Sequence, residues 1–169
     1  VSNVDRNRKN NPKEVLGVRD IMTKAIIVVH PDTPLIEAAR ILNDHGFDGM
    51  PVVDKDKKLV GILTEYDLVS KGSAIHLPTF QAILQNLIIY GKDRAKFHKE
   101  LKELSLLKVH DVMNNDPLVF SLDATFEDVV KTFRDHHRVN PIPVIDKDRI
   151  VIGLVSRFDI LKPLYLPYP

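Results

Sequence analysis

The sequence contains no cysteine, and this absence narrows the chemistry available to the chain. Without thiols the protein forms no disulfide bond and offers no thiolate to a zinc ion, an iron–sulfur cluster or a covalent intermediate. A chain without cysteine fits a reducing compartment, so we expect a cytoplasmic location.

Long apolar stretches are also missing. The longest unbroken run has five residues, 25–29, whereas a membrane-spanning helix needs about 20. The first residues, VSNVDRNRKNNPKE, are polar and lack the apolar centre of a signal peptide. We therefore expect a flexible arm over residues 1–17 and no membrane as a partner.

Charge of one sign is not in excess, because 24 Lys and Arg residues stand against 23 Asp and Glu residues, a net charge of +1. The chain therefore has no overall positive electrostatic field that would attract nucleic acid, and we expect no nucleic acid as a partner. The hydrophobic content of 44% over 169 residues is enough for a core, as one large domain or two small ones.

Motifs of common enzymes and metal sites are absent from the sequence. It contains no G-x-G-x-x-G, no Walker sequence, no G-x-S-x-G and no H-E-x-x-H. His136 and His137 are adjacent, so on a helix their side chains would point about 100° apart and would not chelate one ion together. We therefore expect neither an enzyme nor a metal site.

The sequence does contain one nine-residue motif in two copies. GILTEYDLV at 61–69 and GLVSRFDIL at 153–161 both read glycine, apolar run, Thr or Ser, two residues and Asp. The match extends upstream, where VRDIMTKAIIVV resembles VHDVMNNDPLVF and MPVVD resembles IPVID. Self-similarity of this length predicts two copies of one structural unit, at 18–71 and, with the C-terminal tail, at 109–169.

Each copy predicts the order strand, helix, strand, strand, helix. Apolar residues at helical spacing predict the longer helices. They are Leu35, Ala38, Ala39 and Leu42 in the first copy and Phe126, Val129, Val130 and Phe133 in the second. Thr33 and Thr125 are expected to cap these helices, and the first strand is expected at 26–28. A unit of about fifty residues makes a marginal core, so we expect an α+β fold in which two three-stranded sheets pack about a pseudo-twofold axis.

Residues 72–108, between the copies, are more than a simple connector requires. Their apolar spacing predicts two amphipathic helices. The stripes are Phe80, Ile83, Leu84, Leu87 and Ile88, then Phe97, Leu101 and Leu104. Such stripes are usually buried, so this helical insert is expected to pack on its own module, on a second subunit or on an outside partner. We expect a homodimer.

The DIM and DVM starts, the PVVD and PVID strands and the doubled glycine, hydroxyl and Asp phrase resemble the tandem cystathionine β-synthase (CBS) domain pair, or Bateman module. The resemblance covers 18–71 and 109–162. It implies a non-catalytic regulatory module that binds an adenosine-containing ligand, such as AMP, ADP or ATP, between the repeats, as an energy or metabolite sensor. It further implies a dimer of modules, no resident cofactor and a regulated protein that the sequence does not name.

The repeated phrase supplies a mechanism for this expectation. If Thr64 and Ser156 cap short helices, their hydroxyls and the free backbone N–H groups face the position of an anion, which suits a phosphate. Asp67 and Asp159 lie in the same first turns, and a carboxylate accepts both hydroxyls of a ribose. Arg138, in the loop before the PVID strand, is placed to reach a phosphate.

The flat base is expected between apolar strands. The side chains assigned to it are Ile26, Ile27, Met50, Pro51, Val52, Val119, Ile142, Pro143 and Val144. Arg157 follows Ser156, whereas Glu65 follows Thr64, so we expect the second-copy site to hold a phosphorylated ligand better, with Arg138 as a further donor. Charged groups lent across the twofold axis would reverse this assignment.

Two other interpretations stay open. Thr or Ser followed three residues later by Asp is also a plain capping box, which favours a structural dimerisation or docking module with empty clefts. The chain also fits the regulatory part of a longer transporter or enzyme.

Overall fold

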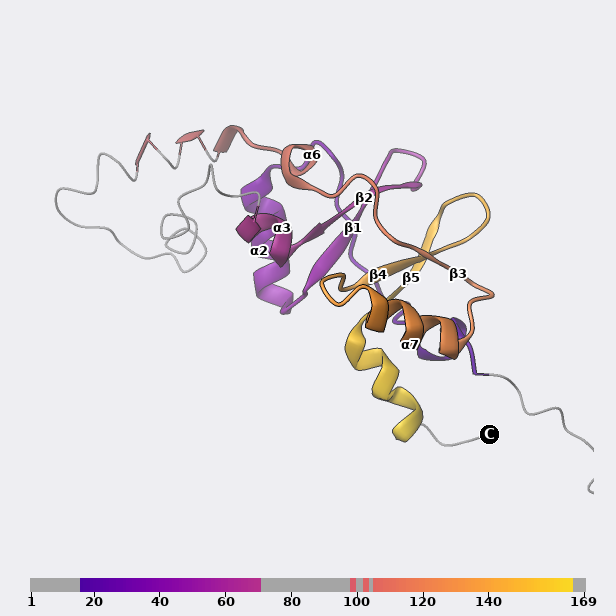
Figure 1. The fold of residues 1–169 in the computed structure, drawn as a ribbon. Coiled ribbons are helices and arrows are strands. Elements are labelled where there is room, and N and C mark those ends of the chain that lie inside the picture. Colours follow the sequence, from indigo (N-terminus) through magenta and orange to yellow (C-terminus); the bar gives the residue numbers. More distant parts are fainter. Residues whose placement is uncertain (1–15, 71–97, 100–101, 104, 166–169) are drawn as a thin grey trace, which may run out of the picture.

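The computed structural model describes residues 16–70, 98–99, 102–103 and 105–165 (Figure 1). The α+β fold is confirmed, with two small sheets and helices beside each. The first unit contains α2 (Leu35–His45), β1 (Gly49–Val53), β2 (Leu59–Thr64) and α3 (Glu65–Ser70). The second contains β3 (Phe120–Ser121), α7 (Phe126–Asp135), β4 (Ile142–Ile145), β5 (Val151–Val155) and the 3-10 helix η3 (Arg157–Leu164). The short helices α1 (Val18–Ile21) and α6 (Val109–Val112) precede them.

The second unit has the expected three-stranded sheet, whereas the sheet described for the first unit has two strands and not the three that were predicted. Strand β4 pairs antiparallel with β5 and parallel with β3, and β1 pairs antiparallel with β2. The strand predicted at 26–28 is reduced to a bridge between Val29 and Val52. The next donor of a parallel ladder would be Pro31, which has no N–H. The ring of His30 takes that place, with Nδ1 2.9 Å from the Val53 carbonyl oxygen.

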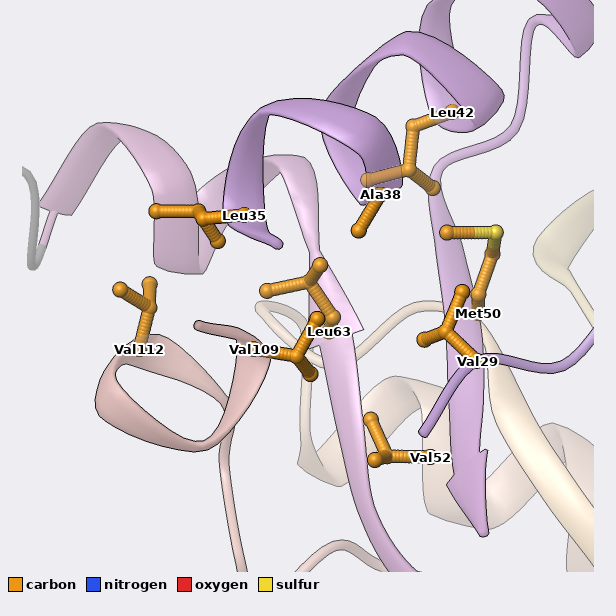
Figure 2. Packing of buried hydrophobic residues seen from close by; sticks show 9 residues of the cluster. All are labelled: Val29, Leu35, Ala38, Leu42, Met50, Val52, Leu63, Val109 and Val112. Carbon is orange, nitrogen blue, oxygen red and sulfur yellow. The ribbon is translucent and has the colours of Figure 1, made fainter. Parts of the chain in front are cut away.

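Helix α2 closes the core of the first unit, as its predicted stripe requires (Figure 2). Leu35, Ala38 and Leu42 are buried and point toward the two strands, where Met50 and Leu63 meet them. Full burial of an aliphatic side chain contributes about 1.5–3 kcal/mol, so this stripe is a main source of the unit's stability.

Helix α7 confirms its predicted cap but not the whole of its stripe. The Asp128 N–H donates to the Thr125 hydroxyl at 3.1 Å, and the Asp128 carboxylate accepts from the Thr125 N–H at 2.9 Å. Val129 and Phe133 are buried, whereas Val130 is 36% exposed. Val130 is one residue further along the helix, about 100° round its axis, and so lies at the edge of the buried face.

The cap predicted for α2 is wrong. The helix begins at Leu35 with Pro34 at the N-cap position, and no side chain caps it. The Thr33 hydroxyl instead accepts the His30 N–H at 3.1 Å. The Thr33 hydroxyl therefore stabilises the turn that precedes α2 and does not cap the helix.

The two short helices are exchanged between the units. Helix α1 begins the first repeat, but its buried Val18 and Ile21 lie in the core of the second unit. Helix α6 begins the second repeat and places Val109 and Val112 in the first core, below α2 in Figure 2. Each core is therefore completed by a helix from the other half of the chain.

The glycine of each repeated phrase makes room for this exchange. A Cβ at Gly61 would lie 2.8 Å from the Asn114 carbonyl oxygen, and a Cβ at Gly153 would lie 2.7 Å from Met22 Sδ. The chain that follows α6 occupies the first space, where Asn114 and Ile62 exchange two backbone hydrogen bonds of 2.9 Å. The segment after α1 makes the same kind of contact with β5.

The apolar residues of the two stripes predicted for the insert, at 80–88 and 97–104, all lie outside the described residues. Across the described ranges, the protein has no helix with the length and apolar character to cross a membrane.

Candidate functional site

A cavity of about 430 Å³ opens between the two units. The first unit contributes the end of β2 and the start of α3, and the second contributes the segment after α6 and the loop between α7 and β4. The lining residues are Ile62, Thr64, Tyr66, Asp67, Asn114, Asp116, Pro117, Leu118, His136, Arg138, Val139, Asn140 and Pro141. Small-molecule sites have volumes of roughly 300–1,000 Å³, so the size suits a ligand.

Thr64 and Asp67 form one wall of the cavity. The Asp67 Oδ2 atom accepts from the Thr64 N–H at 3.1 Å and from the Thr64 hydroxyl at 2.6 Å, and the Asp67 N–H donates to the Thr64 hydroxyl at 3.2 Å. Asp67 is only 6% exposed. The pair thus caps α3 and fixes the carboxylate in place. Because Thr64 uses its donors in this way, a phosphate needs donors from elsewhere.

The basic groups of the cavity come from the second unit. His136 and Arg138 lie in the loop between α7 and β4, and both are exposed to solvent. The sequence-based hypothesis grouped Arg138 with the second-copy motif, whereas the structure places it with Thr64 and Asp67. The reason is the close packing of this loop on the first unit, where Pro141 Cδ lies 2.8 Å from the position of a Cβ on Gly49.

The apolar lining differs from the strand residues predicted to hold a base. Met50, Val52, Ile142 and Val144 are fully buried in the two cores. Side chains alternate along a strand, so these residues face the helices and not the cavity. Pro51 and Pro143 are buried, and Ile26, Ile27 and Val119 are half-buried, but none of the five lines the cavity. Ile62, Pro117, Leu118 and Pro141 line it in their place.

Asn140 connects the cavity to both helix starts. Its Nδ2 donates to Asp48 Oδ2 at 2.7 Å, and its Oδ1 accepts the Arg157 N–H at 3.0 Å. The Asp48 carbonyl in turn accepts the Glu65 N–H at 3.0 Å. The Asn140–Asp48 pair therefore links the first residue of α3 to the first residue of η3.

The second-copy motif is held by other contacts. Asp159 Oδ2 accepts from the Ser156 N–H at 2.6 Å and from the Ser156 hydroxyl at 3.0 Å. Asp159 Oδ1 lies 2.7 Å from Lys162 Nζ and accepts from the Thr23 hydroxyl at 3.4 Å. Lys162 also donates to the Ile21 carbonyl. These contacts tie η3 to the end of α1.

Arg157 packs on its own unit. Its guanidinium carbon lies 6.0 Å from the centroid of the Phe133 ring, and one guanidinium nitrogen donates to the His137 carbonyl. It does not line the cavity that contains Arg138. The phosphate-binding role predicted for Arg157 thus has no support from its position.

Sequence reasoning missed the segment after α6 and two residues of the following loop. These residues are Asn114, Asp116, Pro117, His136 and Asn140. The NNDP stretch carried a usable signal, because it is rich in turn-forming residues where the first copy has TKAI. Among the described residues, no group of three His, Asp or Glu side chains is placed to hold a metal ion.

Comparisons with known proteins agree with this architecture. The CBS domain family model matches residues 18–73 and 109–165. Uncharacterized protein MJ1426 of Methanocaldococcus jannaschii is 31% identical over 164 residues, which cover 94% of this chain and 96% of that protein.

Two solved structures extend the comparison. The complex of CBSX2, a CBS-pair protein from Arabidopsis thaliana, with AMP has a TM-score of 0.65 at 25% identity, over 88% of this chain and 96% of that chain. The CBS domain pair of protein MJ0100 in complex with 5'-methylthioadenosine and S-adenosyl-L-methionine has a TM-score of 0.62 at 25% identity, over 89% and 96%. With both repeats matched over more than half of its length, the chain belongs to the CBS domain family as a tandem pair.

Proposed function

We propose that this module binds an adenosine-containing ligand in the cavity between its repeats and regulates another protein through that binding, without catalysing a reaction. The observation that carries the proposal is that one cavity brings together a buried carboxylate, Asp67, and a guanidinium, Arg138, from opposite units. The ligands named for the similar structures, AMP, 5'-methylthioadenosine and S-adenosyl-L-methionine, all contain adenosine.

Asp67 is proposed to bind the ribose. A carboxylate accepts several hydrogen bonds, and the two hydroxyls of a ribose are donors on adjacent carbon atoms. Thr64 holds the Asp67 side chain by two hydrogen bonds, so little conformational entropy is lost when a sugar binds. Preorganisation of this kind favours affinity.

Arg138 is proposed to bind the phosphate, with His136 beside it. A guanidinium presents a planar fork of donors that matches phosphate oxygens. The base is then left for the apolar lining formed by Ile62, Pro117 and Leu118. The ribose thus contacts the first unit, the base contacts both units, and the phosphate contacts the second unit.

The charges of the lining favour ligands with few negative charges. Among the described residues that line the cavity, Arg138 is the one permanently charged cation, whereas Asp67 and Asp116 are carboxylates. A second and a third phosphate would add repulsion without a further guanidinium to offset it. We therefore expect AMP or a sulfonium nucleoside to bind more tightly than ATP.

The ligand is proposed to act by joining the two units. A molecule that binds only the folded arrangement stabilises that arrangement in proportion to the logarithm of its concentration. The module is proposed to work as a homodimer attached to, or recruited by, a regulated protein. On the absence of cysteine we place it in a reducing compartment such as the cytoplasm.

Thermal unfolding with a panel of adenosine, AMP, ADP, ATP and S-adenosylmethionine tests the proposal. A ligand at 100 times its dissociation constant adds about 2.7 kcal/mol to the free energy of unfolding. Asp67→Asn should abolish the shift, whereas Glu65→Gln, an exposed neighbour outside the lining, should leave it intact. A folded protein that responds to none of these compounds would favour the docking module with empty clefts.

A further inference from the structure

We propose that the hydrogen bond between Asn140 and Asp48 is a positioning contact of the ligand cavity, because it holds the loop that carries Arg138 against the unit that carries Asp67. The inference rests on the proposed function for the roles of Arg138 and Asp67. It assigns a part in binding to Asp48, which is not among the residues that line the cavity. Asp48 acts on the ligand through the loop and not by contact.

Asn140 and Asp48 occupy the same position in the two repeats. Each lies three residues before the proline of its PV strand, which is Pro143 in the second copy and Pro51 in the first. The packing of the units brings these equivalent positions together, with Asn140 Nδ2 2.7 Å from Asp48 Oδ2. Two carboxylates here would repel each other and share no donor. The difference between the repeats at this position therefore creates the bond.

Both polar atoms of the Asn140 amide have partners of the matching kind. Nδ2 donates to the Asp48 carboxylate, and Oδ1 accepts the Arg157 N–H at 3.0 Å. Turning the amide over would place its oxygen against a carboxylate and its NH₂ group against an N–H, so both hydrogen bonds would be lost. Asn140 and Asp48 are both half-buried. The amide therefore has one favoured orientation, and it fastens the loop to two elements at once.

The bond joins the two parts of the chain that carry the proposed ribose and phosphate contacts. On the first unit, the Asp48 carbonyl accepts the Glu65 N–H at 3.0 Å, and Glu65 begins the turn of α3 that contains Asp67. On the second unit, Arg138 lies two residues before Asn140. A short path of covalent and hydrogen bonds thus runs from the carboxylate to the guanidinium.

The loop needs this anchor because Arg138 is exposed to solvent. Within the loop, the Val139 N–H donates to the His136 carbonyl at 3.0 Å, which bends the chain but does not reach the first unit. Hydrogen bonds between Asn114 and β2 also join the units, but they attach the segment after α6. A loop that is not held in place loses conformational freedom when it binds a phosphate, and this loss lowers affinity.

Calorimetry of the full chain compares two substitutions of Asp48 that remove the same charge. Asp48→Asn keeps an oxygen that accepts from Asn140, whereas Asp48→Ala does not, and both keep the backbone carbonyl that accepts from Glu65. We expect AMP to bind Asp48→Ala at least about fivefold more weakly than Asp48→Asn, a difference of about 1 kcal/mol. Adenosine, which has no phosphate, should bind the two variants within about twofold of each other.

A double-mutant cycle shows whether Asp48 acts through Arg138. In an Arg138→Met background, Asp48→Ala should weaken AMP binding by less than about twofold, because the guanidinium that the loop positions is gone. A purely structural role would give the same loss in both backgrounds, and the same loss for adenosine as for AMP. Either result, or equal AMP affinities in Asp48→Asn and Asp48→Ala, would overturn the inference and leave the proposed function standing.

A spin label tests the loop without a ligand. The chain has no cysteine, so Arg138→Cys provides a single attachment site for a nitroxide. Its electron paramagnetic resonance spectrum should show faster motion with Asp48→Ala than with Asp48→Asn. If AMP does not bind the wild-type protein, the proposed function is contradicted and the label still decides the role of Asp48. Equal mobility in the two variants would overturn the inference.

Exchanging the two side chains provides a second comparison if Asp48→Ala does not fold. Asn140→Asp places two carboxylates at the contact, whereas the double variant Asp48→Asn/Asn140→Asp restores one donor and one acceptor in the reverse order. The label at position 138 should move faster in the single variant and return to its wild-type mobility in the double variant. A double variant as mobile as the single one would show that this bond does not position the loop.

Discussion

Arg138 owes its proposed role to its place in the lining of the cavity that also contains Asp67. Arg138→Met keeps much of the side-chain volume and removes the donors. We expect AMP affinity to fall about tenfold or more, because a hydrogen bond to a charged group contributes about 1.5–3 kcal/mol. The affinity for adenosine, which has no phosphate, should stay unchanged in calorimetry. Arg134→Met, on the exposed face of α7, is the control, and an equal loss for both ligands would contradict a phosphate contact.

The two repeated glycines differ in what surrounds them, and this difference is measurable. At Gly61 a methyl group would meet the Asn114 carbonyl oxygen and the Met113 sulfur, both at 2.8 Å. At Gly153 it would meet the Met22 sulfur at 2.7 Å, but the Thr23 carbonyl oxygen lies further away, at 3.2 Å. Overpacking costs typically about 1–3 kcal/mol, so we expect Gly61→Ala to lower the free energy of unfolding more than Gly153→Ala. Urea denaturation of the two variants makes the comparison. Equal losses would mean that Asn114 shifts as readily as Met22.

At the scale of elements, α6 belongs to the first core by its contacts and to the second repeat by its place in the chain. Val112→Ala should therefore destabilise the protein by about 1–3 kcal/mol, since it removes buried methyl groups and leaves a cavity. Val130→Ala makes the same chemical change at a half-exposed site on α7 and should cost clearly less. Guanidinium denaturation of both variants measures the difference. A milder effect at Val112 would place α6 outside the core.

The cap of α7 makes part of the stability depend on pH. Hydrogen bonds from the Thr125 hydroxyl and then from its backbone N–H hold the pKa of Asp128 below its ordinary value of 3.8. A carboxyl whose pKa is lower in the folded state contributes stability above its unfolded pKa and loses it as the pH falls through the folded pKa. The difference between the urea midpoints at about pH 7 and about pH 3 should therefore be smaller in Asp128→Asn than in wild type. The exposed Glu127→Gln variant should not change the difference.

Much of the fold was predictable because the deciding signals are local. The strand predicted at 50–54 is observed at Gly49–Val53, and the stripe of α2 is buried as predicted. The partners of Asp67 were not predictable, because helical and strand periodicity give the faces of an element but not its neighbours in the other repeat. Arg138 illustrates this limit, since the packing of the two units decides which of the two similar motifs shares a cavity with it.

At the scale of the whole molecule, association into a homodimer remains a prediction. Apolar side chains on α3 and η3 are well exposed in the single chain, among them Tyr66, Val69, Phe158 and Leu164. Burying them against a second copy would remove apolar area from water. Sedimentation velocity should show a dimer that Val69→Glu weakens, whereas Leu84→Asp tests the insert stripe. A monomer at every accessible concentration would exclude the dimer.

The exchange of α1 and α6 also governs the order in which the chain acquires structure. During synthesis the core of the first unit stays incomplete until Val109 and Val112 have been made. Helix α1 gains its core contacts later still, when the strands of the second unit have been made. The contacts that complete each core therefore span long sequence separations, which slows folding. Removing either short helix leaves a core open, so the two repeats are expected to gain and lose their structure together.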